Sequence, residues 1–376
     1  MNDQNHPTRI EVNLTQFEQN LRIIKNVIGK RLLCLPVKAN AYGHGLIEMG
    51  KSAVSAGVDV LGVAHPKEGA LLRRGGLETR ILVFGPFFED QIDELTQHGL
   101  EFSISSKEQV DILSKHLRKK CKVHLKVETG MQRTGVTLDH ALELFLYLKQ
   151  IPLIEIVGVY SHLATSETPD DSNTLRQIFE FKKLTSDKAF NGVSLHLANS
   201  GGVLHYPESY LDMVRPGIIS YGYLPENAPL SFRGIAPCLS LKSKVSFSKK
   251  VPMGTGIGYG RTYVADKQTG IATVPIGYGD GYLRTLSNRG SVLIWGQKCP
   301  IVGSICVDQL MVNTGPLQCE PGDEVILIGE EIKLAEIAKL SHTIVYEIMC
   351  LLNDRISRNY YYGDNIPNVI QESVLD

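Results

Sequence analysis

A lysine inside the stretch VKANAYGHG, residues 37–45, is placed where side chains often do chemistry. Lys38 follows the short apolar run LLCLPV, and Gly43 and Gly45 follow it before a segment with helical periodicity begins. Most lysines are solvated on the protein surface, so an amine at the end of a buried strand is unusual. In α/β proteins that end of the sheet is where ligands bind, which makes Lys38 a candidate nucleophile.

Polar side chains also end the later apolar runs. They are Lys126 and Arg133 at and after the fifth run, His162 after the sixth, Asn199 and Ser200 after the seventh, and Arg215, Gly217 and Ile218 at the eighth. Ser200 and the backbone N–H groups near Gly217 could hold a phosphate. A lysine beside a phosphate suggests a Schiff base, which points to pyridoxal phosphate, with a lysine-dependent aldolase as the alternative.

Eight apolar, β-like runs alternate with helix-like segments in the first part of the chain. The runs are 32–37, 58–64, 80–84, 101–104, 122–127, 154–160, 193–198 and 211–219. Between them lie segments such as 14–28, where apolar residues recur at spacings of three and four. Continuous apolar runs are typical of strands buried on both faces, so the pattern predicts a (β/α)8 barrel, with an open doubly wound sheet as the alternative.

The pattern changes after the proline-rich stretch YGYLPENAPLSFRGIAP. Short β-like runs separated by turns then dominate, interrupted by one helical segment at about 333–352. We therefore expect two domains: a cofactor-binding barrel at 1–235 and a mainly β domain at 236–376.

The composition of the 376 residues is that of an ordinary globular protein, with 43% hydrophobic and 21% charged residues. A net charge of -1 gives no electrostatic reason to expect nucleic acid or an anionic membrane surface. The polar N-terminus lacks the apolar core of a signal peptide, so we expect a cytoplasmic protein. The seven cysteines lack CxxC spacing, so we expect buried free thiols and neither disulfides nor a metal site.

As a set, these motifs resemble the bacterial alanine racemases. VKANAYGHG, HLKVETGMQRTG, HLANS, VRPGI, GYGRTY, PIGYGDGY and ICVDQ occur in that family's order over nearly the whole chain. The resemblance implies a pyridoxal phosphate enzyme that interconverts L- and D-alanine and supplies D-alanine for peptidoglycan. It also implies a homodimer in which the β domain of one subunit completes the site of the other.

The resemblance further implies that Lys38 holds the cofactor as an internal aldimine and is the base for D-alanine. Tyr263 of the partner would be the base for L-alanine, since racemisation needs a proton-transfer group on each face of the substrate. Arg215 matches the residue that faces the pyridine nitrogen, and a guanidinium can donate a hydrogen bond there without releasing its proton. The other matches are Tyr42, His162, Ser200, Gly217 and Ile218 for the cofactor, Arg133, Val307 and Tyr278 for the substrate, and Lys126 for a lysine that is carbamylated in many members.

Some positions depart from the family's pattern. Gln132 and Thr134 flank Arg133 where glycine and leucine are more usual, and Val307 replaces a common methionine. Asp354 stands where a tyrosine usually binds the cofactor phosphate, and a carboxylate facing that phosphate would repel it unless it is solvated or paired with a nearby arginine.

Two other functions remain open from the sequence. One is a serine or broad-specificity amino-acid racemase of the same fold. The other is a non-catalytic pyridoxal phosphate carrier, which the β domain and Tyr263 argue against because such carriers resemble only the barrel.

Overall fold

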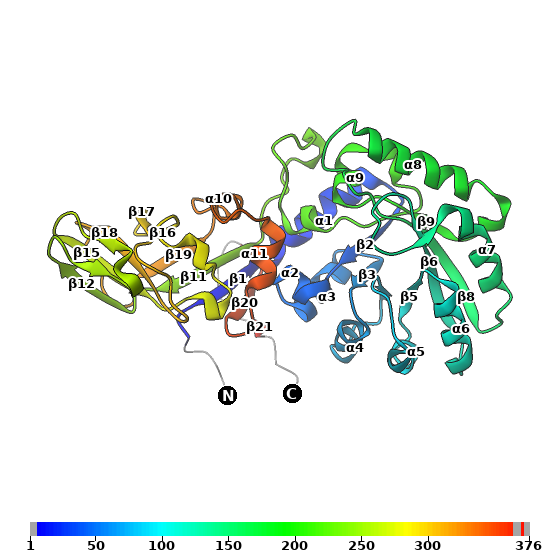
Figure 1. Cartoon of the computed structure of the whole chain (residues 1–376), viewed down its shortest axis with the longest axis horizontal. Coiled ribbons are helices and arrows are strands. Elements are labelled where there is room, and N and C mark those ends of the chain that lie inside the picture. The colour runs from blue at the N-terminus through cyan, green and yellow to red at the C-terminus, as the bar shows by residue number, and fades with distance from the viewer. Residues whose placement is uncertain (1–5, 364–369, 372–376) are drawn as a thin grey trace. The chain divides into compact units, whose positions relative to one another are not determined.

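The computed structural model of the chain describes residues 6–363 and 370–371. The chain divides into two compact units (Figure 1). The barrel unit consists of residues 16–41 and 46–237. The β unit consists of the described parts of 1–15, 42–45 and 238–376.

The barrel unit contains a closed parallel sheet. Its eight main strands are β2 (Leu32–Pro36), β3 (Val60–Val63), β4 (Arg80–Val83), β5 (Glu101–Ile104), β6 (Cys121–Glu128), β8 (Ile154–Tyr160), β9 (Ser194–His196) and β10 (Met213–Val214). Strand order runs β5-β4-β3-β2-β10-β9-β8-β6, and an additional β5–β6 pairing closes the ring. The predicted barrel is therefore confirmed, and the closure excludes the open doubly wound sheet.

Helices follow the strands and cover the outside of the barrel (Figure 1). They are α1 (Leu14–Ile28), α3 (Leu46–Ser55), α4 (Pro66–Arg74), α5 (Ile92–Gln97), α6 (Lys107–His116), α7 (Leu138–Lys149), α8 (Ser172–Thr185) and α9 (Ser200–His205), with the short strand β7 (Val136–Thr137) before α7. Ser106 and Asp171 cap α6 and α8 by accepting a backbone N–H with their side chains. Strands β3 and β5 are buried along their whole length, as the apolar runs predicted.

The segment after β2 is a turn of left-handed helix, and Gly43 and Gly45, which follow it, also have positive φ before α3 begins. It is α2 (Lys38–Tyr42), in which Ala39, Asn40 and Ala41 have φ between 51° and 53°. Left-handed backbone is costly for alanine, so other contacts must hold it. Ala39 N–H donates to Glu68 Oε1 at 2.7 Å, and Asn40 Oδ1 accepts from Leu46 N–H at 2.7 Å.

The β unit contains two sheets, a hairpin and two helices. The larger sheet has the order β17 (Gln297–Pro300), β16 (Ser291–Ile294), β19 (Glu324–Ile328), β11 (Leu239–Lys244), β1 (Arg9–Asn13), β20 (Ser357–Tyr361) and β21 (Ile370–Gln371). The smaller sheet joins β12 (Phe247–Val251), β15 (Thr269–Val274) and β18 (Leu310–Gly315), and the hairpin pairs β13 (Gly256–Ile257) with β14 (Tyr263–Val264). The helices are α10 (Leu334–Leu340) and α11 (Val345–Leu351).

Two expectations about the organisation need correction. We expected residues 1–235 in the barrel, but β1 belongs to the β unit because it pairs antiparallel with β11 and parallel with β20. The expected helical segment 333–352 is two helices, since His342 between them has a positive φ of 54°.

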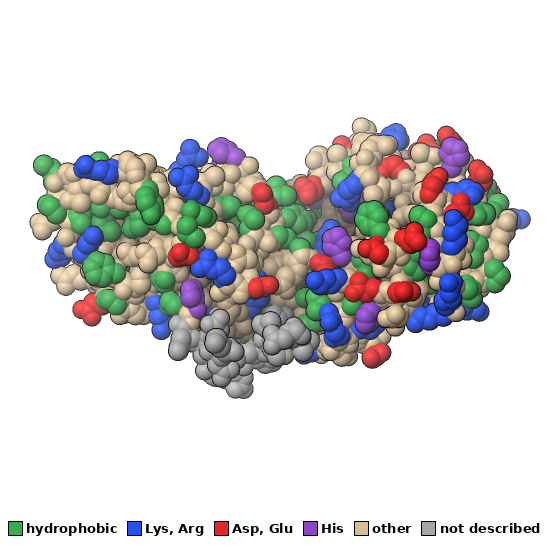
Figure 2. All heavy atoms as spheres, turned by 60° about the horizontal axis from the view of Figure 1, so that its bottom comes forward, with side chains coloured by type: hydrophobic (Ala, Val, Ile, Leu, Met, Phe, Trp, Pro, Cys, Tyr) green, Lys and Arg blue, Asp and Glu red, His purple; other side chains and the backbone are tan. Residues whose placement is uncertain are grey.

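The described surface carries mixed charge. Figure 2 shows acidic and basic side chains interspersed over the face of the barrel unit that it draws. No helix among the described residues is long and apolar enough to cross a membrane. The cysteines are free, and five are buried, but Cys306 is partly exposed and Cys350 exposed, so the expectation of seven buried thiols is wrong for these two.

Candidate active site

The barrel places its candidate residues at one rim. Lys38 begins α2 directly beyond β2, Lys126 lies near the end of β6, and His162 follows β8. Ser200 opens α9 after β9, and Arg215 follows β10. Because the strands are parallel and the barrel is closed, their C-terminal ends form a common mouth, which is where barrels build ligand sites.

Arg215 is enclosed by the barrel and is 4% exposed. Its Nη2 donates to the carbonyls of Ser161 at 2.6 Å and Leu197 at 3.2 Å, and its Nη1 contacts His196 Nδ1 at 2.9 Å. No described hydrogen bond uses Nε, so that N–H can serve a ligand. Burial lowers the pKa of Arg215, but a guanidinium stays charged in proteins.

Positive charge accumulates around the rim. Burial, Arg215, Arg133, Lys126 and Lys38 hold the pKa of His162 well below its usual value. Burial, followed by Arg133 and Arg215, lowers the pKa of Lys126 to about 8, with a smaller contribution from Lys38. Neighbouring cations of this kind favour an anionic ligand, because bound negative charge offsets their repulsion.

Thr134 gives the Lys126 amine a partner. Lys126 Nζ donates a hydrogen bond to Thr134 Oγ1 and lies 5.6 Å from the centre of the Tyr160 ring. A leucine at 134 would offer no such acceptor, so this departure from the family's pattern changes the setting of Lys126 directly.

The loop that carries Arg133 is organised by a carboxylate that the sequence analysis did not consider. Glu128 Oε1 accepts from Gly130 N–H at 2.5 Å, and Oε2 accepts from Arg133 N–H at 3.3 Å. Burial raises the pKa of Glu128, but the backbone donors of residues 130–133 outweigh it and lower the pKa overall. Glu128 stands in the quoted motif HLKVETGMQRTG, so an acidic residue just before the turn was the available signal.

The expected phosphate residues lie together. Gly217 N–H donates to Ser200 Oγ at 2.9 Å, and Ile218 follows directly at the start of a short 3-10 turn, Ile218–Tyr221. Asn199 Oδ1 caps α9 by accepting from Gly202 N–H at 3.0 Å. Ser200, Gly217 and Ile218 are all buried at the same mouth as Arg215.

Tyr263, at the start of β14 in the β unit, is held by an amide that the sequence analysis missed. Asn313 Nδ2 donates to the Tyr263 hydroxyl oxygen at 2.9 Å. Asn313 Oδ1 accepts from Thr269 Oγ1 at 2.6 Å and from Gly315 N–H at 2.9 Å, so the orientation of its amide is fixed. The Tyr263 oxygen thus receives one hydrogen bond and keeps its own proton available for another group.

Two expected substrate residues of the β unit are brought together by backbone pairing. Tyr278 N–H donates to Cys306 O at 3.1 Å, and Gly279 N–H donates to Val307 O at 2.8 Å. Tyr278 and Val307 are 48% and 44% exposed, so both remain accessible on this unit. Tyr42, in contrast, is buried, and its ring packs edge-on against Tyr346 at 5.7 Å.

Asp354 is paired with an arginine of its own unit. Its side chain is 89% exposed, and Oδ1 accepts from Arg358 Nη1 at 3.2 Å. Arg358 is 4% exposed and also donates from Nε to the carbonyl of Gly43 at 2.9 Å. The carboxylate is thus both solvated and paired with an arginine, the two conditions that the sequence analysis left open.

Comparison with known proteins agrees with this geometry. Residues 12–225 match the family model described as the alanine racemase N-terminal domain, and residues 238–360 match the alanine racemase C-terminal domain. The chain is 38% identical over 383 residues to "Alanine racemase 2" of Caldanaerobacter subterraneus, covering 98% of both chains. The chain therefore belongs to the alanine racemase family.

Solved structures give the same result. Alanine racemase from Clostridium difficile matches with a TM-score of 0.92 at 33% identity, covering 97% of this chain and 98% of that one. The alanine racemase of Bartonella henselae, solved with covalently bound pyridoxal phosphate, matches with a TM-score of 0.86 at 28% identity, covering 94% of this chain and 99% of that one.

We predict that, in the cofactor-free protein, Lys126 titrates near pH 8, because burial and its cationic neighbours destabilise the ammonium. The folded-state pKa lies below the usual 10.5, so the charged amine destabilises the fold in full below pH 8, and this penalty disappears as the pH rises toward 10.5. NMR of 13Cε-labelled lysine, assigned with Lys126→Met, measures the titration. A midpoint near 10.5 would contradict the prediction.

Proposed function

We propose that this protein is an alanine racemase that interconverts L- and D-alanine and supplies D-alanine for peptidoglycan in the cytoplasm. The observation that carries the proposal is the gathering of Lys38, Lys126, His162 and Arg215 at the C-terminal mouth of a barrel that matches alanine racemases over its full length. A β unit that also matches the family argues against a non-catalytic carrier built from the barrel alone.

The rim fits pyridoxal phosphate. The neighbouring cations suit an anionic ligand, and the Ser200 hydroxyl, whose oxygen accepts from Gly217 N–H, suits its phosphate as a donor. Lys38 would hold the cofactor covalently, with Tyr42, His162 and Ile218 as further contacts. When bound, the cofactor supplies an electron sink that makes the α-proton of an amino acid acidic.

Arg215 would face the ring nitrogen with its Nε–H, a donor that no described hydrogen bond uses. A guanidinium donates a hydrogen bond but does not transfer its proton, so the electron sink stays weak. A weak sink suits an enzyme that only exchanges a proton, because it disfavours side reactions such as transamination.

Two bases would act on opposite faces of the substrate. Lys38 would exchange the proton with D-alanine, and Tyr263 of a partner subunit would exchange it with L-alanine. The Asn313 hydrogen bond supports this role because it orients the Tyr263 hydroxyl. Arg133, Tyr278 and the backbone at Val307 would bind the substrate, and the role requires a homodimer. Lys126 would act as a carbamate that orients Arg133.

The proposal predicts that purified protein in heavy water converts L-alanine to an equal mixture of the enantiomers, with deuterium at the α-carbon. Chiral chromatography with mass detection measures both quantities. Lys38→Ala is the control and should show neither change. L-serine turned over as fast as L-alanine would favour the broad-specificity racemase, and no exchange with any amino acid would favour the carrier.

We predict an asymmetric effect of Tyr263→Phe. Loss of the hydroxyl removes the base for L-alanine, so racemisation in both directions falls by about a hundredfold or more, while α-deuterium exchange from D-alanine through Lys38 persists. The matched variant Tyr259→Phe, at an exposed tyrosine nearby in sequence, should leave both rates unchanged. Full racemisation by Tyr263→Phe would exclude Tyr263 as a base.

A further inference from the structure

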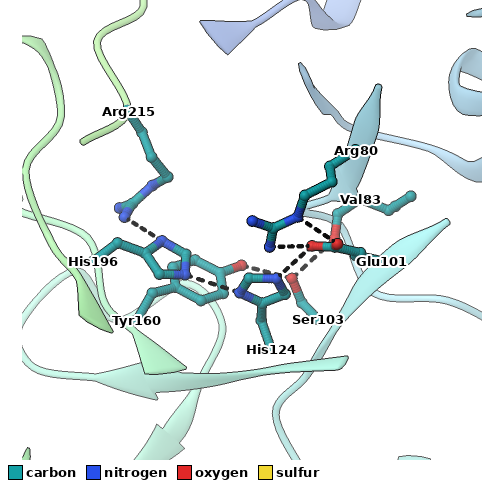
Figure 3. Close-up of polar contacts among 8 residues, drawn as sticks. All are labelled: Arg80, Val83, Glu101, Ser103, His124, Tyr160, His196 and Arg215. Atoms are coloured by element: carbon teal, nitrogen blue, oxygen red, sulfur yellow. Dashed lines mark hydrogen bonds and ion pairs between the residues drawn. The ribbon is translucent and has the colours of Figure 1, made fainter. Parts of the chain in front are cut away.

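A continuous chain of hydrogen bonds leads from Arg215 into the interior of the barrel (Figure 3). Arg215 Nη1 contacts His196 Nδ1 at 2.9 Å, and His196 Nε2 contacts His124 Nδ1 at 2.9 Å. His124 Nε2 contacts Glu101 Oε2 at 2.9 Å. Arg80 then pairs with both carboxylate oxygens of Glu101, at 2.7 and 2.9 Å.

This chain of hydrogen bonds spans the barrel from one mouth to the other. Arg80 and Glu101 are the first residues of β4 and β5, and His124 lies in the middle of β6. His196 is the last residue of β9, and Arg215 follows β10. A cavity of about 310 Å³ borders the Arg80 and Glu101 end. Arg215 and the Arg80–Glu101 ion pair therefore lie at opposite mouths of the barrel.

The chemistry of the end groups fixes the direction of every bond. A guanidinium only donates, so His196 Nδ1 must accept and the proton of His196 must be on Nε2. That proton is donated to His124 Nδ1, which leaves the His124 proton on Nε2, directed at Glu101. An ionised carboxylate only accepts, so all three bonds run from Arg215 toward Glu101.

The protonation states agree with this direction. Burial, Arg215, His124 and Arg80 hold the pKa of His196 well below its usual value, and burial lowers that of His124, so both rings are neutral. Burial raises the pKa of Glu101, but hydrogen bonds from His124 and Arg80 outweigh it and lower the pKa to about 2. The carboxylate is thus an acceptor at any pH at which the fold is expected to work.

Packing holds the two imidazoles in these positions. The His196 ring is stacked on Tyr160, with centroids 4.7 Å apart and an interplanar angle of 7°. Tyr160 is fixed in turn by a 2.7 Å hydrogen bond between its hydroxyl and Ser103 Oγ (Figure 3). Position 158 must be glycine beside His124, because a Cβ there would lie 2.2 Å from His124 Nδ1.

We propose that Glu101, His124 and His196 are positioning residues, which hold the Arg215 guanidinium in place through this one-directional chain of hydrogen bonds. The inference rests on the proposed function, in which Arg215 meets the ring nitrogen of the cofactor. In this proposal the Glu101 carboxylate, at the opposite mouth of the barrel, affects how strongly Arg215 binds that nitrogen.

Glu101 can act at this distance because a neutral imidazole carries its proton on either of its two ring nitrogens. Without an acceptor at position 101, the His124 proton can move to Nδ1, and His196 must then carry its proton on Nδ1. That places a donor against the Arg215 donor and displaces the guanidinium. Removing His124 has a related effect, because the buried Nε2–H of His196 then lacks its acceptor.

The test compares the affinity of the cofactor-free protein for two compounds. One is pyridoxal phosphate, and the other is its analogue with C–H in place of the ring nitrogen. Because the two compounds differ only there, the ratio of their dissociation constants measures the contribution of the ring nitrogen to binding. We expect His124→Phe and Glu101→Leu to reduce the preference for pyridoxal phosphate by about fivefold or more. Glu101→Gln retains an acceptor for His124 and should keep the preference.

Glu11→Leu is the matched control. Glu11 is also a buried carboxylate, 2% exposed and paired with Arg9 at 2.8 Å and Lys242 at 2.9 Å, but it lies in the β unit. It should leave the preference unchanged even if stability falls. The proposal is overturned if His124→Phe and Glu101→Leu weaken both compounds equally. A wild-type protein without any preference would instead refute the placement of Arg215 in the proposed function.

Neutron diffraction from crystals of the unaltered protein in heavy water tests the direction of these hydrogen bonds without any variant. We expect deuterons on Nε2 of His124 and His196 and none on their Nδ1 atoms. A deuteron on Nδ1 of either ring would overturn the proposal, whether or not the variants fold.

Discussion

The burial of the Arg215 charge constrains the rest of the barrel. A guanidinium that is 4% exposed needs acceptors for the donors that it takes out of water. Two carbonyls and His196 Nδ1 accept hydrogen bonds from its Nη atoms, and Glu101, itself paired with Arg80, is the last acceptor of the chain that continues through two neutral rings. Polar residues inside an otherwise apolar barrel follow from this requirement.

The same charge contributes to the electrostatics of the rim. Burial is the main cause of the lowered pKa values of Lys126 and His162, and Arg133 and Arg215 lower both further. Neighbouring cations of this kind favour a bound anion, which supports the phosphate-bearing cofactor of the proposed function. In the proposed function the second base would be Tyr263, oriented by Asn313, from the β unit of a partner subunit.

The sequence predicted the barrel well because its strands are buried on both faces and read as apolar runs. It also predicted the rim residues, since a closed parallel sheet gathers the strand ends at one mouth. It could not assign β1 to the β unit, because strand pairing across more than 200 residues leaves no local pattern. The left-handed turn at Ala39 to Ala41 was missed for a similar reason, as alanine gives no signal for that backbone.

The residues that support the site were the hardest to predict. His124 and Glu101 lie inside runs interpreted as strands, and Glu128 and Asn313 act through backbone or amide contacts that spacing does not reveal. Their roles depend on which side chains meet across the fold. Asp354 illustrates the limit, since only the structure identifies Arg358 as its partner.

The central claim is that Arg215 donates a hydrogen bond and keeps its proton. The direct measurement is the 15N chemical shift of the ring nitrogen in pyridoxal phosphate labelled at that atom and bound to the protein at neutral pH. The account predicts the shift of an unprotonated, hydrogen-bonded ring nitrogen. The shift of a protonated pyridinium would contradict it.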